Sequence, residues 1–121
     1  MARLVSDKKA HMRRLESLRT RTQTLVTHME KLLQEYQLVR REERKEAAHV
    51  FVRILTKVYH AFDINSETER TIHRDLYALL LSASHSTDYD EIINMCRQFT
   101  EDGVTRLKAR IKAIESEIED A

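Results

Sequence analysis

The sequence contains no proline, and Gly103 is its only glycine. Proline interrupts helix interiors and glycine weakens them, so a chain nearly free of both can form long helices. A sheet protein needs turn residues every few positions, and those residues are missing here. With 121 residues, of which 41% are apolar and regularly spaced, the chain is large enough for one domain with its own core. We therefore predict a single all-α domain that spans residues 1–121.

Cysteine and long apolar runs are also scarce. Cys96 is the only cysteine, which excludes an intramolecular disulfide and a cysteine-based metal cluster. No apolar run is long enough to span a membrane, and no apolar stretch follows a charged N-terminus to form a secretion signal. These absences predict a cytoplasmic protein.

The net charge of +1 conceals an asymmetry along the chain. Residues 1–45 hold 12 Lys and Arg against 6 Asp and Glu, a balance of +6. Residues 46–121 hold 9 against 14, a balance of −5. Such a distribution indicates either a polyanion-binding arm or two parts of the fold that attract each other.

Two stretches carry apolar residues at alternating steps of three and four, the spacing of a coiled-coil seam. If the stretches pair antiparallel with Leu25 opposite Ile111, Arg19 comes near Glu115 and Arg21 near Glu117. Whether this seam closes within one chain or between two chains is left open. The seam residues are Leu15, Leu18, Leu25, Met29 and Leu32 in the first stretch, and Val104, Leu107, Ile111, Ile114 and Ile118 in the second.

The pattern predicts coiled-coil helices over residues 6–41 and 88–120, with shorter helices over 46–62 and 66–84. Ser6 suits the start of the first helix, and Ser66 with Glu69 forms the S-x-x-E capping box that starts the third. The run RREERKEA at 40–47 favours helix locally, whereas the segment lengths favour a reversal of the chain there. The prediction is an elongated antiparallel bundle of three or four helices with a coiled-coil base.

No combination of residues predicts catalysis. The chain has no Ser-His-Asp or Cys-His arrangement and no glycine-rich phosphate loop. Glu46 and His49 have the E-x-x-H spacing of di-iron bundles, but a second copy is absent. Cys96 lies on an apolar stripe, where a buried thiol is unreactive. We therefore expect no enzyme activity, no cofactor and no metal.

Two surfaces stand out as candidate contact sites. His49, Arg53, Lys57 and His60 line one side of the helix over 46–62, either as a docking patch for an acidic partner or as a solvated face. The second half of the helix over 66–84 is apolar nearly all round, which indicates either complete burial or an oligomer interface. Its apolar residues are Leu76, Tyr77, Leu79, Leu80 and Leu81.

These observations predict a protein–protein interaction module, such as an adaptor, scaffold or regulatory subunit. We expect it to form a homodimer and to bind a protein partner whose identity the sequence does not give. The alternative is a nucleic-acid-associated regulator that uses the basic first helix, around Lys8, Lys9, Arg13 and Arg14. That helix has almost no aromatic residues for base stacking, so the alternative is not favoured.

Overall fold

The computed structural model describes residues 2–120, which form four α-helices and one short 3₁₀ helix. No β-strand occurs in this part of the chain, so the predicted all-α class is confirmed. The four α-helices correspond in order to the predicted ranges 6–41, 46–62, 66–84 and 88–120, but most of their first and last residues differ from the predicted ones. They are α1 (Ala2–Gln37), η1 (Arg41–Glu43), α2 (Arg44–Tyr59), α3 (Glu67–His85) and α4 (Tyr89–Asp120).

The chain reverses after α1, which settles the question that residues 40–47 left open. α1 ends at Gln37, and residues 38–40 turn the chain into η1 and α2. Local propensity favours continuation, but tertiary packing overrides it, because the reversal lets Phe51 pack edge-on against Tyr36 at 4.4 Å between ring centroids. The predicted helix start at Ser6 is wrong, since α1 already begins at Ala2.

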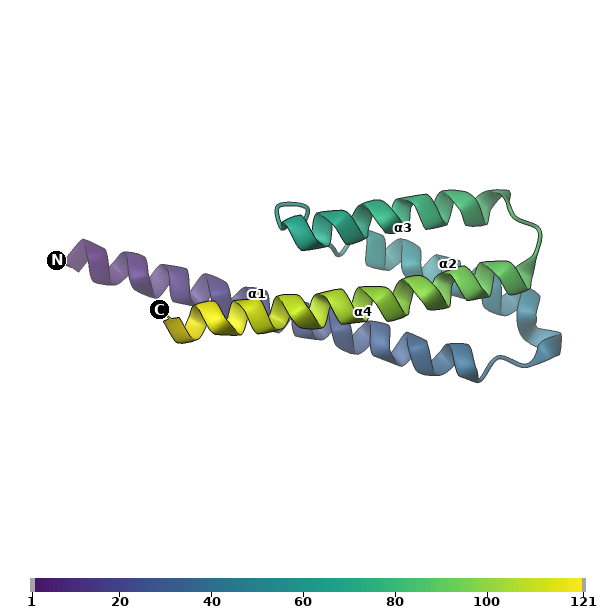
Figure 1. Cartoon of the computed structure of the whole chain (residues 1–121), viewed down its shortest axis with the longest axis horizontal. Helices are drawn as coiled ribbons and strands as arrows, with labels where there is room; N and C mark the ends of the chain where they lie inside the picture. The colour runs from purple at the N-terminus through teal and green to yellow at the C-terminus, as the bar shows by residue number, and fades with distance from the viewer. Residues whose placement is uncertain (1, 121) are drawn as a thin grey trace.

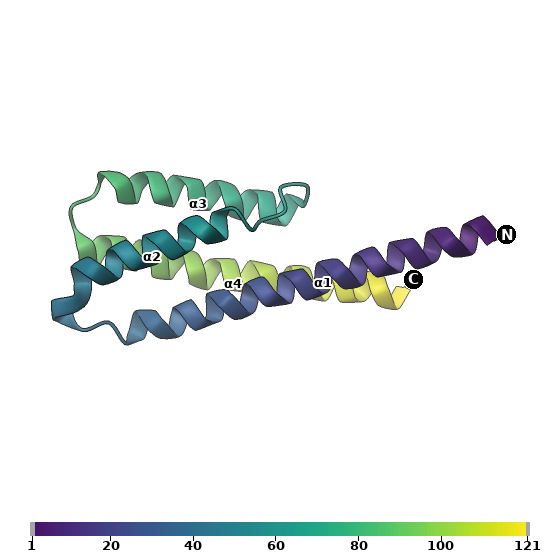
Figure 2. The ribbon, with the colours of Figure 1, turned by 180° about the vertical axis from the view of Figure 1, so that it is seen from behind.

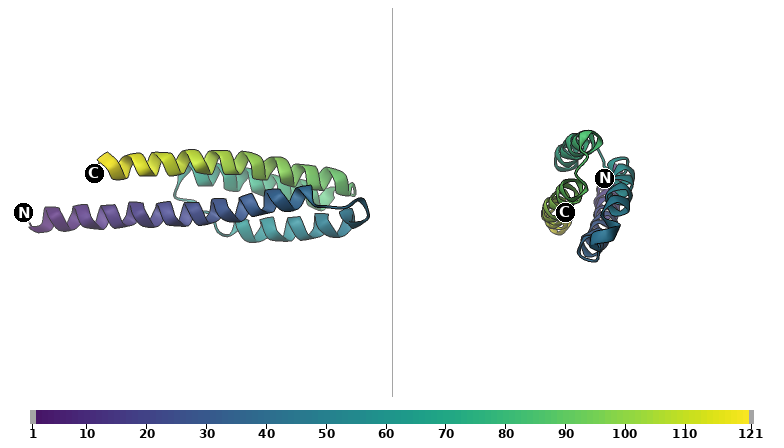
Figure 3. Two further views of the ribbon diagram at one scale, coloured as in Figure 1. Left: turned by 90° about the horizontal axis from the view of Figure 1, so that it is seen from below. Right: turned by 90° about the vertical axis from the view of Figure 1, so that its right-hand side faces the viewer.

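The two long helices run antiparallel and carry both chain ends at one end of an elongated molecule (Figure 1). We call this end the base. The α2–α3 hairpin covers only the other half of the long helices, and the turns around residues 38–40 and 86–88 form the tip (Figures 1 and 2). At the base, α1 extends further than α4 (Figure 3). α4 packs closely on each of the other three helices and is the centre of the bundle.

The core lies where all four helices meet. Its largest fully buried side chains include Met29, Leu55, Ile72, Leu76 and Leu107, and at least one comes from each α-helix. Burial of one such side chain contributes about 1.5–3 kcal/mol. Toward the base only α1 and α4 remain in contact with each other, and the buried seam narrows to residues such as Leu15 and Ile114.

Candidate functional site

Glu69 lies in the first turn of α3, where only half of the predicted capping box forms. Its backbone N–H donates to Ser66 Oγ at 3.4 Å, as the capping box predicts. The reciprocal half of the box does not form, because the Ser66 N–H donates to the Asp63 carbonyl at 3.1 Å instead. The Glu69 carboxylate is therefore free to bind elsewhere, and its side chain is fully buried.

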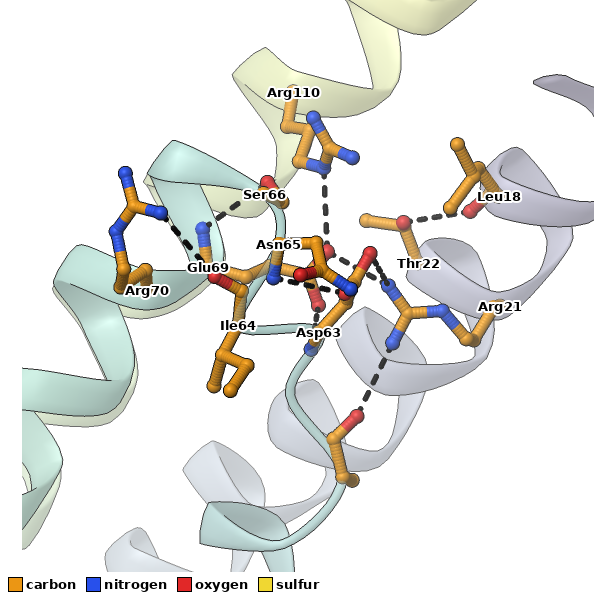
Figure 4. Close-up of polar contacts among 11 residues, drawn as sticks. Leu18, Arg21, Thr22, Asp63, Ile64, Asn65, Ser66, Glu69, Arg70 and Arg110 are labelled. Atoms are coloured by element: carbon orange, nitrogen blue, oxygen red, sulfur yellow. Dashed lines mark hydrogen bonds and ion pairs between the residues drawn. The ribbon is translucent and has the colours of Figure 1, made fainter.

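The carboxylate of Glu69 lies between two arginines from the long helices (Figure 4). Its Oε2 atom is 2.7 Å from Arg21 Nη2 of α1 and 3.3 Å from Arg110 Nε of α4. Its Oε1 atom accepts the Asp63 N–H at 3.2 Å. A buried carboxylate is tolerated only when it is paired and hydrogen-bonded, and here both oxygens have partners. We call Arg21, Asp63, Ser66, Glu69 and Arg110 the Glu69 cluster.

The cluster ties the α2–α3 loop to both long helices. Arg21 Nη1 also donates a hydrogen bond to the Ala61 carbonyl at 3.1 Å, and Arg21 Nη2 lies 3.9 Å from Asp63 Oδ2. The Arg110 Nε contact with Glu69 is an ion pair without hydrogen-bond alignment. The predicted approach of Arg21 to Glu117 is wrong, because Arg21 instead pairs with the buried carboxylate of Glu69 in the first turn of α3.

The predicted seam residues lie between α1 and α4 of the same chain. Tyr36 Oη is 3.0 Å from Thr100 Oγ1, and this pair continues the register that sets Leu25 opposite Ile111. Neither Arg19 nor Glu115 takes part in an ion pair among the described side chains, so the salt bridge expected between them is not present. Seven of the ten seam residues are buried, namely Leu15, Leu25, Met29, Leu32, Val104, Leu107 and Ile114, whereas Leu18, Ile111 and Ile118 are half-buried.

Two ionisable side chains, those of Cys96 and Tyr36, are buried in the core. Thr100 Oγ1 donates to the Cys96 carbonyl at 2.7 Å, which leaves Tyr36 as the donor to Thr100. Burial raises the pKa of the Cys96 thiol to about 12, and burial also raises the pKa of Tyr36 well above its usual range. Cys96 is fully buried, as the apolar stripe predicts. Both groups stay protonated at neutral pH and support packing.

No set of three or more potential metal ligands comes together within residues 2–120. Glu46 and His49, the E-x-x-H pair, are both exposed on α2. Nor does any helix of that part of the chain have both the length and the hydrophobicity to cross a bilayer.

The predicted basic row is exposed along the outer side of α2. His49, Arg53, Lys57 and His60 are all exposed, and we call them the α2 ridge. Arg53 and Lys57 form no ion pair with any side chain that the structure describes. The two histidine rings contact aromatic neighbours, at 5.9 Å between His49 and Tyr89 and at 5.3 Å between His60 and Tyr59.

One side of α3 faces α2 and carries exposed apolar side chains. Tyr77 of α3 is 57% exposed and Leu81 is 51% exposed, so complete burial of this helix is excluded. Tyr77 faces α2, since its ring lies 6.3 Å from that of Tyr59, and Leu81 lies one turn further along the same face. At the tip, a cavity of about 350 Å³ lies between this side of α3, α2 and the start of α4. We call this face and its cavity the hairpin groove; the side chains around the cavity include Ala48, His49, Val52, Leu80, Ala83 and Tyr89.

No protein-family model matches this chain, no curated protein matches its sequence, and no solved structure matches its fold. Its function must therefore be argued from the geometry above. The Glu69 cluster is closed and links three segments of the chain, whereas the α2 ridge and the hairpin groove face solvent. The ridge could be found from the sequence, but the buried role of Glu69 could not, because its partners are 48 and 41 residues away along the chain.

Proposed function

We propose that this protein is a non-enzymatic interaction module, an adaptor, scaffold or regulatory subunit, that binds its protein partner through the outer face of the α2–α3 hairpin. One observation carries the proposal. Among the described side chains, six large apolar ones are well exposed; Val50, Ile54, Ile64, Tyr77 and Leu81 belong to the α2–α3 hairpin, and Leu38 lies in the turn after α1. Exposed apolar side chains that cluster on one part of a surface mark interaction sites.

Large apolar side chains at the base are buried, in contrast to those exposed on the hairpin. There, Leu15 and Ile114 are buried between α1 and α4, and their seam needs no second chain to cover it. We infer that the base acts as a coiled-coil stalk that presents the hairpin at the opposite end of the molecule. The homodimer and the cytoplasmic location that the sequence predicts remain predictions. We expect a dimer to use the hairpin face, because Leu15 and Ile114 of the stalk seam are already buried within one chain.

Site-specific photocrosslinking tests the proposal. A photoreactive phenylalanine analogue at Tyr77 places the probe on the exposed hairpin, and the same analogue at Lys112 places it on the exposed side of the base. In the native host, we expect a discrete crosslinked protein from position 77 and none from position 112. Equal products from both positions, or none from either, would contradict a partner-binding hairpin.

One observation favours the nucleic-acid alternative. The N-terminal part of α1 extends beyond α4 (Figure 3). Lys8, Lys9, Arg13 and Arg14 of α1 are exposed without ion-pair partners among the described side chains, and a hollow separates Lys8 and Lys9 from Glu117 and Asp120 of α4. Such a basic rod can contact phosphates, and its affinity would fall steeply with salt. A salt titration against generic duplex DNA tests this reading, since no binding at low salt would exclude it.

A further inference from the structure

We propose that the hairpin groove binds an acidic amphipathic α-helix of a partner protein, with its acidic side against the α2 ridge and one large apolar side chain in the tip cavity. This inference rests on the proposed function and specifies the chemistry of the partner. It draws on three features of the same face, which are its charge, its exposed apolar side chains and its cavity.

The α2 side of this face carries positive charge on Arg53 and Lys57 that no described side chain pairs, while the acidic residues near it, Asp88, Asp90 and Glu91, lie at the tip. The stretch from Ala47 to Phe62 contains no acidic residue, so the α2 ridge has no carboxylate on its own helix beyond Glu46. On α3, Asp75 turns toward α4 and binds Arg106 at 2.8 Å, while Glu69 is enclosed by its own cluster. Complementary charge across an interface fixes the orientation of a partner and speeds its association. The missing countercharge is therefore expected from the partner.

The spacing of the ridge matches a helix. Positions 49, 53, 57 and 60 repeat at steps of four, four and three, which places about one basic group on each turn of α2. An acidic helix packed alongside can present carboxylates at the same interval. A partner segment that binds by β-strand addition would need an unpaired strand edge, and residues 2–120 contain no strand.

The groove supplies an anchor site for such a helix. Tyr77 and Leu81 provide exposed apolar area, and the walls of the tip cavity of about 350 Å³ include aliphatic side chains such as Val52, Leu80 and Ala83. Helix-in-groove complexes typically depend on one or a few large side chains buried in pockets of this kind. The cavity thus has room for one bulky apolar side chain of the partner.

The same observations favour an acidic helix over a single-stranded nucleic acid. A strand would need free aromatic faces on which its bases can stack. Tyr59 is not free on one face, because the ring of His73 stacks on it at 3.9 Å between centroids. The two aromatic rings that line the cavity, those of His49 and Tyr89, stand edge-on to each other at 5.9 Å between centroids, so a base cannot stack on both.

The test uses the full chain and a defined probe. The probe is a fluorescein-labelled peptide of about 18 residues, or five helical turns, with Glu along one side and Leu plus a single Trp along the other. A matched peptide carries Lys in place of Glu, and a labelled oligouridine serves as the nucleic-acid probe. Fluorescence anisotropy at fixed salt measures binding of each probe.

Three variants locate the binding site. Arg53→Glu with Lys57→Glu reverses the ridge, and Arg13→Glu with Arg14→Glu makes the same change of net charge on the exposed base. Ser84→Trp fills the mouth of the cavity from an exposed position. We expect the acidic peptide to bind the wild type, and the ridge reversal to weaken it about tenfold or more. Ser84→Trp should also weaken it, whereas the reversal on the base should change it less than about twofold.

Several results would overturn the proposal. One is that the Lys peptide binds as tightly as the Glu peptide. Another is that both charge reversals weaken binding of the Glu peptide equally. A third is that oligouridine binds the wild type and the ridge reversal abolishes this binding. A dimer in light scattering that is lost with Tyr77→Ser and Leu81→Ser would show that a second copy occupies the groove. If the acidic peptide fails while crosslinking at position 77 succeeds, the partner chemistry is wrong but the interaction function stands. If both fail, the proposed function falls as well.

Discussion

Glu69 is a fully buried carboxylate whose two oxygens contact Arg21, Arg110 and the backbone of Asp63. Removing a charge from water is expensive, and in this cluster the cost is offset by two guanidinium groups and a backbone donor. The arrangement holds only if α1, the α2–α3 loop and α4 keep their relative positions. The hairpin is therefore fixed to the long helices at this point by charge, and nearer the tip by apolar packing.

Replacing Glu69 should therefore be costly. Glu69→Ala leaves the buried Nε of Arg110 without its ion-pair partner, and we expect a loss of about 3 kcal/mol in the free energy of unfolding. The loss is placed at the lower end of the range for broken buried pairs, since the Arg21 side chain is 37% exposed and water can solvate it. Glu67→Ala, at an exposed position in the same helical turn, is the control and should cost less than about 1 kcal/mol. Urea unfolding measures both variants, and similar losses would contradict a special role for the cluster.

The buried thiol and phenol make stability depend on alkaline pH. Cys96 ordinarily ionises near 9.0, and burial raises its pKa to about 12 in the folded chain. A group whose pKa is higher in the folded state stabilises the fold fully below its unfolded pKa, and this contribution is lost as the pH rises toward the folded pKa. We therefore expect stability to fall by roughly 1.4 kcal/mol per pH unit above pH 9 on account of Cys96 alone. Tyr36, with its pKa raised as well, adds to the fall at still higher pH.

Urea midpoints measured between pH 8 and pH 11 test this expectation. Cys96→Ala removes one titrating group, so its midpoint should decline less steeply than that of the wild type, and Tyr36→Phe should act similarly at the upper end. An unchanged slope in Cys96→Ala would show that other groups cause the alkaline loss.

At the scale of the helices, Gly103 leaves room for the end of the Met29 side chain between α1 and α4. A Cβ atom at position 103 would lie 2.7 Å from Met29 Cε, too close for two carbon atoms. Met29 is itself fully buried, so a side chain larger than hydrogen at position 103 displaces a packed methionine. The single glycine of the chain thus occurs inside a helix because of packing, and α4 continues through it without a break.

We predict that Gly103→Leu destabilises the fold by about 1–3 kcal/mol through overpacking. Met29→Ala alone also destabilises, because it leaves a cavity. In the double variant the leucine can occupy the space that the methionine vacates, so the combined loss should be smaller than the sum of the two. A double-mutant cycle by urea unfolding measures this difference, and strictly additive losses would contradict direct contact between the two positions.

Whether the sequence predicts a structural element depends on how far apart along the chain the interacting residues lie. The helix starting after Ser66 is readable because its cap lies within one turn, and the antiparallel register of α1 and α4 follows from two apolar seams. The reversal after Gln37 has no local turn signal, since it is stabilised by the contact of Tyr36 with Phe51. The exposure of Tyr77 and Leu81 depends on how α3 rotates against α2 and α4, and an all-round apolar pattern does not specify that rotation.

The whole molecule consists of two parts with different packing, a four-helix part toward the tip and a two-helix part at the base (Figures 1 and 3). In the first part, Leu76 and Leu107 are completely enclosed by surrounding helices. At the base each helix buries its seam against a single neighbour, and the flanking Leu18 and Ile118 are partly exposed. Regions with few buried contacts open locally at a lower free energy than the global unfolding reaction.

We therefore predict a gradient of amide hydrogen exchange along the long helices. Amides of α1 near residues 8–14 and of α4 near residues 114–120 should exchange through local opening, while those around Met29 and Leu107 should exchange only through global unfolding. Leu15→Ala should lower protection at the base and leave the tip unchanged, because only the base seam loses a side chain. Leu76→Ala, in the enclosed core, should lower protection of the tip amides by the full loss of global stability, about 2–5 kcal/mol. If Leu15→Ala reduced protection equally at both ends, the two parts would unfold as one cooperative unit, and the base would be integral to the fold of the hairpin.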